Sequence, residues 1–394
     1  MPKFFYTAKS FSGEAKSGTI EAKDEYQLAR ILRQEGYILI SANFEEEKEK
    51  FEMTLPFFGG VSLTEKIFFT RNLRVMIGAG ISLPRALETL AYQSKSKKFK
   101  KALLGIAREI TKGKSFSDSL IKYPNIFSEL FISMVKVGEE AGTLEEVLKT
   151  LTSQMEREHE LKSKIKGAMV YPAVIICAMI GIGILMLIVV VPRLAETFEE
   201  LNIEFPPTTK FVIFLGNFLA KNWPLALLLI FAIFILFRLI LGTKGGKKIF
   251  DFLTLKIPII SPIIKKTNSA STVRTLSSLI SSGVPIVRAL EIVSRTLGNT
   301  YFQEAIASSV EKVKKGSKLS EALRPYSGLY PPIVGQMIEV GEETGETSSV
   351  LVKLADFFEE EVSNATKNLS SVIEPILMLL IGATVGFFAI SMIQ

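Results

Sequence analysis

Three long apolar runs interrupt an otherwise polar chain. The first covers residues 167–192 without a charge, the second covers 224–241 with Arg238 as its only charge, and the third covers 371–394 with Glu374 as its only charge. About 20 apolar residues are enough to cross the hydrocarbon core of a bilayer as a helix. The pattern therefore predicts three transmembrane helices at these positions.

The polar segments between these runs have a mostly helical pattern. Residues 63–166 and 242–370 carry apolar residues at helical spacing, broken by glycines and serines into about six short helices each. Ser82 and a capping box, Thr143-x-x-Glu146, are expected to begin two of them. Residues 193–223 are expected to form a loop between the first two spans.

The first 44 residues differ from the rest. Residues 1–44 combine two short β-like runs around Ser-Gly turns, an amphipathic helix and a final strand, and the charged run within 45–62 is typical of a solvated linker. The predicted fold is therefore an all-α polytopic membrane protein with two helical bundles, three transmembrane helices and a small N-terminal α/β domain.

An internal repeat relates the two helical segments at a fixed offset of 203 residues. GISLPRALE at 80–88 matches GVPIVRALE at 283–291, and VGEEAG at 137–142 matches VGEETG at 340–345. Arg71 falls on Arg274, and the register continues into the spans, where Tyr171-Pro172 falls on Glu374-Pro375. One helical module followed by one span thus occurs twice, and the middle span joins the copies.

The charge distribution predicts the orientation in the membrane. The chain has 47 Lys and Arg against 40 Asp and Glu, a formal charge of +7. Residues 1–166 carry +5 and 238–367 carry +4, whereas 193–222 carry −1. The positive-inside rule then places the N-terminus and both modules in the cytoplasm, with residues 193–223 and the C-terminus outside. This placement explains the excess charge without direct binding to nucleic acid.

Little in the sequence points to catalysis. Gly113-Lys114-Ser115 resembles the end of a phosphate-binding loop, but Arg108 stands where the first glycine of that motif is needed, so a helix end followed by an N-cap serine is the favoured interpretation. The single His159 and the single Cys177 exclude a multi-histidine centre, a Cys-based zinc site and an internal disulfide framework. We therefore expect no enzyme, no cofactor and no metal site.

The two Gly-Glu-Glu-x-Gly loops are the candidate interaction sites. Each places two carboxylates at a helix C-terminus, where they oppose the helix dipole at a cost of about 0.3–1 kcal/mol each. Ion pairs with Arg71 or Arg85, or with Arg274 or Arg288, are the favoured compensation, and a cation or a partner surface is the alternative. The residues concerned are Gly138, Glu139, Glu140 and Gly142 in the first copy and Gly341, Glu342, Glu343 and Gly345 in the second.

The spans carry packing signals and few charges. Gly382 and Gly386 have the small-xxx-small spacing that lets helices approach closely, within one chain or between chains. Charges in the middle of the membrane, typical of ion-coupled transporters, are missing, and this counts against a transport function. A transporter or channel acting as an oligomer is kept as the second hypothesis. The candidate packing residues are Tyr171, Pro172, Glu374, Pro375, Gly382 and Gly386.

Taken together, these features resemble the inner-membrane platform family of type IV pilus and type II secretion machines. The resemblance covers the whole chain and includes FTRNLRVMIGAGISLPRALE, KGKSFSDSLIKYPNIF, VGEEAGTLEEVL and MVYP in the first copy, LKIPIISPIIKK after the second span, and VGEETG and VIEP in the second copy. It implies a non-enzymatic protein of the bacterial inner membrane.

The same resemblance implies the partners. They are a hexameric assembly or retraction ATPase, pilins or pseudopilins, and other inner-membrane assembly proteins, with a homo-oligomer, as a dimer, suggested by the doubled module. Some relatives carry calcium near the first acidic loop. Glu139 matches that position, but a single carboxylate does not make a calcium site.

Overall fold

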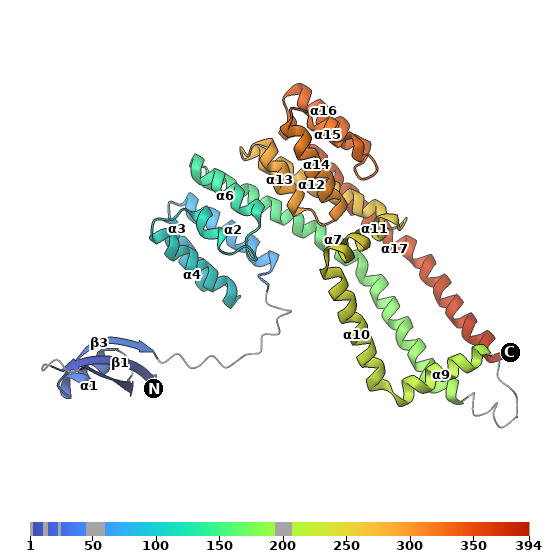
Figure 1. Ribbon diagram of the computed structural model, residues 1–394, viewed down its shortest axis with the longest axis horizontal. Helices are drawn as coiled ribbons and strands as arrows, with labels where there is room; N and C mark the ends of the chain where they lie inside the picture. Colours follow the sequence, from blue (N-terminus) through green and yellow to red (C-terminus); the bar gives the residue numbers. More distant parts are fainter. Residues whose placement is uncertain (1–2, 11–14, 23–24, 45–59, 194–206, 394) are drawn as a thin grey trace. The chain divides into compact units, whose positions relative to one another are not determined.

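The computed structural model describes residues 3–10, 15–22, 25–44, 60–193 and 207–393 (Figure 1). The chain divides into two compact units, residues 1–59 and 60–394, and each is described by itself. Most of the predicted linker at 45–62 lies outside the described residues, as do residues 194–206 of the predicted loop.

The N-terminal unit is a three-stranded antiparallel sheet covered by one helix. Its elements are β1 (Lys3–Ser10), β2 (Ala15–Glu21), α1 (Glu25–Gln34) and β3 (Tyr37–Phe44), and the strand order is β2-β1-β3. Leu28 and Leu32, one helical turn apart on α1, are fully buried with Tyr6 and Ala8 of β1. The small α/β domain is therefore confirmed.

The first repeat is a bundle of short helices. It comprises α2 (Leu63–Gly78), α3 (Leu83–Gln93), α4 (Lys97–Thr111), α5 (Phe116–Ile121), α6 (Glu129–Ala141) and the start of α7 (Leu144–Leu185). The second repeat has the same order. It comprises α12 (Ser261–Ser281), α13 (Ile286–Thr296), α14 (Thr300–Lys314), α15 (Leu319–Leu323), a 3-10 turn (Arg324–Tyr326), α16 (Pro332–Thr344) and the start of α17 (Thr347–Ile393), preceded by α11 (Lys244–Lys256).

Equivalent apolar positions fill both bundles. Phe99 and Phe302, which are 203 residues apart, are at most 1% exposed, and the buried side chains of the two repeats form one continuous hydrophobic cluster. Deletion of a buried aromatic ring of this kind costs about 3–5 kcal/mol, so this shared core is what holds each bundle together.

Serine side chains cap four helices of the first repeat, and each accepts a helix N–H at 3.1–3.3 Å. They are Ser62, Ser96, Ser115 and Ser128. Ser82 and Thr143 also stand at N-cap positions, but neither side chain accepts a helix N–H, so the predicted capping box is wrong. Thr143 instead closes the turn after α6, where its own N–H donates to the Gly138 carbonyl at 2.8 Å.

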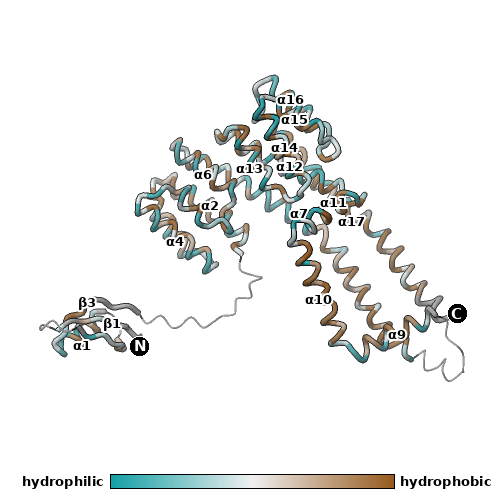
Figure 2. Tube along the Cα trace, viewed as in Figure 1, coloured by the Kyte–Doolittle hydropathy of each residue, from teal (hydrophilic) through white to brown (hydrophobic). Residues whose placement is uncertain are grey.

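Within the described residues, three helices are long and apolar enough to cross a membrane, as predicted. The first is α7, which continues through a short π-helix, Met186–Val190, to residue 193. The second is α10 (Trp223–Gly242), and the third is the distal part of α17. Figure 2 shows hydrophobic residues along α10 and along the distal parts of α7 and α17. Because α7 and α17 are continuous, each bundle is joined to its span by one unbroken helix.

One element was missed within the predicted loop at 193–223. Residues Pro207–Lys221 form a helix, α9, whose apolar run FVIFLGNFLA is too short to span the bilayer. Val212 of α9 is buried against Leu187 and Val191 at the end of the first span. A Cβ atom at Gly216 would lie 2.4 Å from the Leu187 carbonyl oxygen, so only glycine allows this close approach.

Candidate interaction site at the acidic loops and between the repeats

The first glutamate of each acidic loop caps a neighbouring short helix. The Glu139 carboxylate, at the end of α6, accepts the N–H of Phe116 at 2.6 Å and the N–H and hydroxyl of Ser117 at 3.0 and 2.8 Å. These groups form the N-terminus of α5, where a carboxylate is favoured by the helix dipole. The unfavourable position at the end of α6 is thereby offset.

The second repeat builds the same cap. Glu342 accepts the N–H of Leu319 at 2.6 Å and the N–H and hydroxyl of Ser320 at 3.3 and 2.5 Å, at the N-terminus of α15. Hydrogen bonds to a charged group contribute about 1.5–3 kcal/mol. The loop glutamates at these two positions therefore have a structural role inside each bundle.

The expected ion pairs of these glutamates with arginine are wrong. Arg71 pairs with Glu156 of α7, and Arg274 pairs with Glu359 of α17 at 2.7 Å and with Asp356. The reason is that α2 and α12 lie against the long helices α7 and α17, so their arginines reach carboxylates there. Glu156 and Glu359 are themselves 203 residues apart, so this pair is a second shared feature of the repeats.

The glycines of the loops serve close packing and a left-handed turn. A Cβ atom at Gly138 would lie 2.8 Å from the Val147 side chain, and one at Gly341 would lie 3.0 Å from the Thr347 backbone. Gly142 and Gly345 end α6 and α16 with φ of 71° and 73°, a conformation that L side chains rarely adopt. The spacing of the motif is thus explained by helix packing and termination.

The second glutamate of each loop is exposed. The Oε1 atom of Glu140 lies 3.9 Å from Nζ of Lys136 on the same helix, and the Glu140 side chain is two-thirds exposed. Glu343 is also exposed, at the end of α16. Such an exposed pair on one helix contributes little to stability. Glu140 and Glu343 are therefore the members of the motif that remain accessible to a partner.

A buried polar contact joins the two repeats. Gln154 of α7 is 7% exposed; its amide donates to the Thr275 hydroxyl at 3.3 Å and accepts from the Ser278 hydroxyl at 2.8 Å, both on α12. Buried amides are costly unless their hydrogen bonds are made, so this contact specifies one docking of the first repeat on the second.

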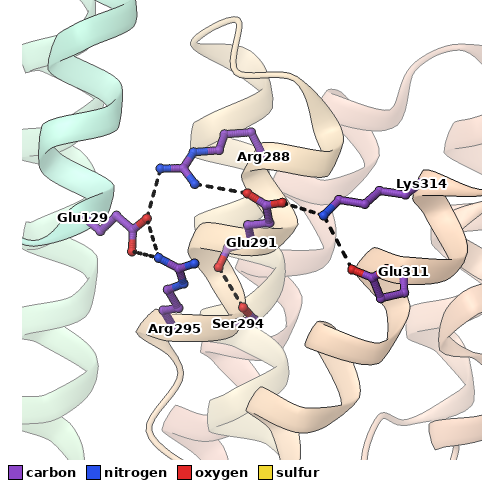
Figure 3. A network of polar contacts seen from close by, with 7 residues as sticks. All are labelled: Glu129, Arg288, Glu291, Ser294, Arg295, Glu311 and Lys314. Atoms are coloured by element: carbon purple, nitrogen blue, oxygen red, sulfur yellow. Dashed lines mark hydrogen bonds and ion pairs between the residues drawn. The ribbon is translucent and has the colours of Figure 1, made fainter.

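Beside it, a charged network crosses from α6 to α13 (Figure 3). Glu129, the first residue of α6, binds Arg288 at 3.0 Å and Arg295 at 3.2 Å. Arg288 also binds Glu291 at 3.1 Å, and Glu291 binds Lys314 of α14 at 2.9 Å. The hydrogen bonds from Lys314 and then from Arg288 lower the pKa of Glu291, and the bond to Glu291 raises the pKa of Lys314.

A cleft of about 550 Å³ lies between the repeats, next to these contacts. Residues of both repeats line it, among them Leu130, Gln154, Thr275 and Leu297. Gln154, Glu129 and Ser278 were not identified from the sequence, because a single polar residue on a helix gives no sign that it faces another module. A difference between the repeats could have indicated them, because their counterparts at the offset of 203 are the apolar residues Phe357, Pro332 and Val75.

The remaining candidates fall into two groups. Ser115 caps α5 and Gly113 ends α4 with φ of 89°, so the interpretation of Gly113-Lys114-Ser115 as a helix end and cap is confirmed. His159 is exposed on α7. In the spans, Pro172 is buried within α7, whereas Tyr171, Glu374 and Pro375 are exposed. A Cβ atom at Gly382 or Gly386 would have no neighbour within 4 Å. The packing role of these five residues remains a prediction.

The comparisons with known proteins agree with this architecture. The model of the family "Type II secretion system (T2SS), protein F" matches residues 69–192 and again 272–394, one match for each repeat, and the model of that family's N-terminal domain matches residues 1–43. The chain is 35% identical over 394 residues to the type IV pilus assembly protein PilC of Thermus thermophilus, which covers 100% of this chain and 97% of that protein. It is 34% identical over 390 residues to PilC of Myxococcus xanthus, covering 99% and 93%, and 30% identical over 376 residues to type II secretion system protein F of Aeromonas hydrophila, covering 95% and 97%.

Proposed function

The chain belongs to the type II secretion system protein F family of multi-pass membrane proteins, and we propose that it is a non-enzymatic platform. It couples a cytoplasmic assembly ATPase to the insertion or removal of pilin or pseudopilin subunits. The observation that carries the proposal is the pair of unbroken helices, α7 and α17, each of which begins in a bundle and continues as a span. A displacement of a bundle is thereby transmitted to a membrane helix without an intervening hinge loop.

The proposed orientation has both bundles in the cytoplasm, with residues 193–223 and the C-terminus outside. Basic residues at the bundle ends of the spans support it, because such residues are favoured on the cytoplasmic side. They are Lys162, Lys164 and Lys166 on α7 and Lys244, Lys247 and Lys248 on α11.

The proposed contact with the ATPase includes the exposed glutamates Glu140 and Glu343. They occupy equivalent positions on the two bundles. Each bundle therefore offers one exposed carboxylate at the same position to a hexameric partner, whose own surface is repeated. The capping glutamates Glu139 and Glu342 are excluded from this contact, because their carboxylates are already bound to helix N-termini.

The test measures binding of the purified protein in nanodiscs to the assembly ATPase of its own machine. Glu140→Lys combined with Glu343→Lys is expected to weaken binding about tenfold, a loss of ~1.4 kcal/mol. Glu321→Lys, another exposed glutamate, is the control and is expected to bind normally. Unchanged binding by the double variant would remove these loops from the contact, and ATP hydrolysis by the purified chain alone would overturn the non-enzymatic assignment.

A further inference from the structure

Helix α11 joins the second span to the second bundle. It begins at Lys244, directly after the turn that follows Gly242 at the end of α10, and it lies beside α12 and α14 where the bundle meets the spans (Figure 1). The turn is tight: the Thr243 hydroxyl accepts the Gly246 N–H at 3.0 Å. A Cβ atom at Gly246 would clash with the Ile240 carbonyl oxygen. Because α10 is a span, the start of α11 is thereby fixed at the membrane surface.

One face of α11 is bound to the second bundle. The buried Asp251 carboxylate accepts the N–H and the hydroxyl of Thr300, the first residue of α14, at 2.8 and 2.6 Å. Lys248 binds Glu304 of α14 at 2.6 Å, and Leu255 packs against the shared hydrophobic core. Residues 248, 251 and 255 are three and four positions apart, so they share one side of the helix. The bundle thus determines which side of α11 faces away from it.

The opposite face of α11 is apolar and exposed. Ile249, Leu253 and Ile257 follow one another at intervals of four residues and are 64%, 54% and 40% exposed. Phe250, at the edge of this face, packs edge-to-face on Phe237 of the second span, with the ring centroids 6.4 Å apart. The apolar face of α11 is therefore continuous with the apolar surface of α10.

The charges of α11 are almost all positive. The helix has Asp251 as its single carboxylate, which is bound to α14, and it carries four lysines, one of which pairs with α14. The other three are exposed in the first and last turns of the helix and are Lys244, Lys247 and Lys256. An exposed apolar face accompanied by lysines is typical of a helix that lies in the plane of an anionic membrane surface.

The internal repeat does not account for this face. At the offset of 203 residues, α11 corresponds to residues 41–53, where Glu46 and Lys50 stand at the positions of Ile249 and Leu253. Helix α11 also lies outside both segments that the family model matches. The apolar and basic helix thus belongs to the copy that directly follows a span, which favours the membrane as its contact.

We propose that α11 lies in the membrane surface on the bundle side and binds anionic phospholipid there. Ile249, Leu253 and Ile257 insert among the upper parts of the acyl chains, and the three exposed lysines bind the lipid phosphates. The continuity with α10 and the charge complementarity favour lipid over a protein partner. Because the other face of α11 is bound to α14, lipid then holds the second bundle at the membrane surface.

The first test measures the depth of the far end of α11 in vesicles of phosphatidylcholine and phosphatidylglycerol. Trp223, the only tryptophan, is replaced by phenylalanine, and Ile257→Trp supplies the reporter in the full chain. Since α11 is about 20 Å long, its last turn contacts lipid only if the helix lies along the surface. Lipids brominated near the headgroup are expected to quench Ile257→Trp at least about twofold more strongly than Ile333→Trp. Ile333 is the matched control, because it is 38% exposed on α16, which lies away from the spans (Figure 1).

Two results would overturn the proposed position of α11. Equally weak quenching of both reporters would place the helix in water or under another protein. Stronger quenching of Ile257→Trp by lipids brominated at the bilayer centre would show a helix inserted into the hydrocarbon rather than one lying on it.

The second test concerns the headgroup. Omitting phosphatidylglycerol from the vesicles is expected to lower the quenching of Ile257→Trp about twofold, and replacing the three exposed lysines of α11 by glutamine is expected to abolish this dependence. The control variant loses the same charge at three exposed lysines of the first repeat, Lys95, Lys98 and Lys101, and is expected to keep the dependence. Quenching that does not depend on phosphatidylglycerol, or a dependence that survives loss of the α11 lysines, would overturn the binding of anionic lipid.

Discussion

The two repeats share the residues that hold each bundle and differ in those that meet another bundle. Both copies cap a short helix with the first loop glutamate, and both pair an arginine with a glutamate of the long helix. By contrast, Gln154 has Phe357 as its counterpart, and Glu129 has Pro332. Internal architecture is therefore repeated, whereas docking is specific to each face, and a duplicated module can occupy two different environments.

The largest expected difference between the repeats concerns the shared arginine. The Arg274 side chain is 14% exposed and binds Glu359, itself 15% exposed, whereas the Arg71 side chain is 60% exposed. Removing one partner of a largely buried pair leaves the other carboxylate unpaired, so Arg274→Ala is expected to cost about 3 kcal/mol. Arg71→Ala is expected to cost less than about 1 kcal/mol. Urea unfolding in detergent micelles measures both, and equal costs would contradict this difference between the repeats.

The next prediction separates the two glutamates of one loop. Glu139→Ala removes three hydrogen bonds to the N-terminus of α5 and is expected to cost about 2 kcal/mol. Glu140→Ala, on the adjacent exposed residue, is expected to cost less than about 0.5 kcal/mol. Hydrogen exchange of residues 116–121 supplies the readout, because loss of the cap should raise exchange there first. A larger effect of the Glu140 variant would reverse the roles given to the pair.

A third prediction concerns the contact between the repeats. The coupling energy of Gln154 and Ser278 in a double-alanine cycle is expected to be about 1 kcal/mol, since the hydroxyl donates to the amide oxygen at 2.8 Å. Ser281 is the control partner, because its hydroxyl binds the Ser277 carbonyl of its own helix. Its coupling to Gln154 is expected to be near zero. A similar coupling for both serines would mean that the cycle reports general destabilisation of α12.

The sequence was sufficient for the repeat and the spans, because these depend on patterns that extend over many residues. It was not sufficient for the target of Glu139, because the N-terminus of α5 is made of backbone N–H groups that no residue type reveals. Nor did it show that Gln154 faces the other repeat, since that depends on how two bundles dock. The helix α9 was missed because its apolar run is short and lies between two spans.

The smallest expected effect is the pH dependence that Glu291 contributes in the second repeat. The pKa of Glu291 is lowered from its usual value of 4.5 by Lys314 and Arg288, so its ion pairs stabilise the folded chain above about pH 4.5 and lose their effect as the pH falls through the lowered pKa. Between about pH 5 and pH 3, the midpoint of unfolding is expected to change less steeply with pH in Glu291→Gln than in the unmodified chain. Glu88, its counterpart in the first repeat, is exposed, and Glu88→Gln is expected to leave that slope unchanged. An identical slope in all three proteins would mean that the ion pairs of Glu291 with Lys314 and Arg288 do not stabilise the folded chain.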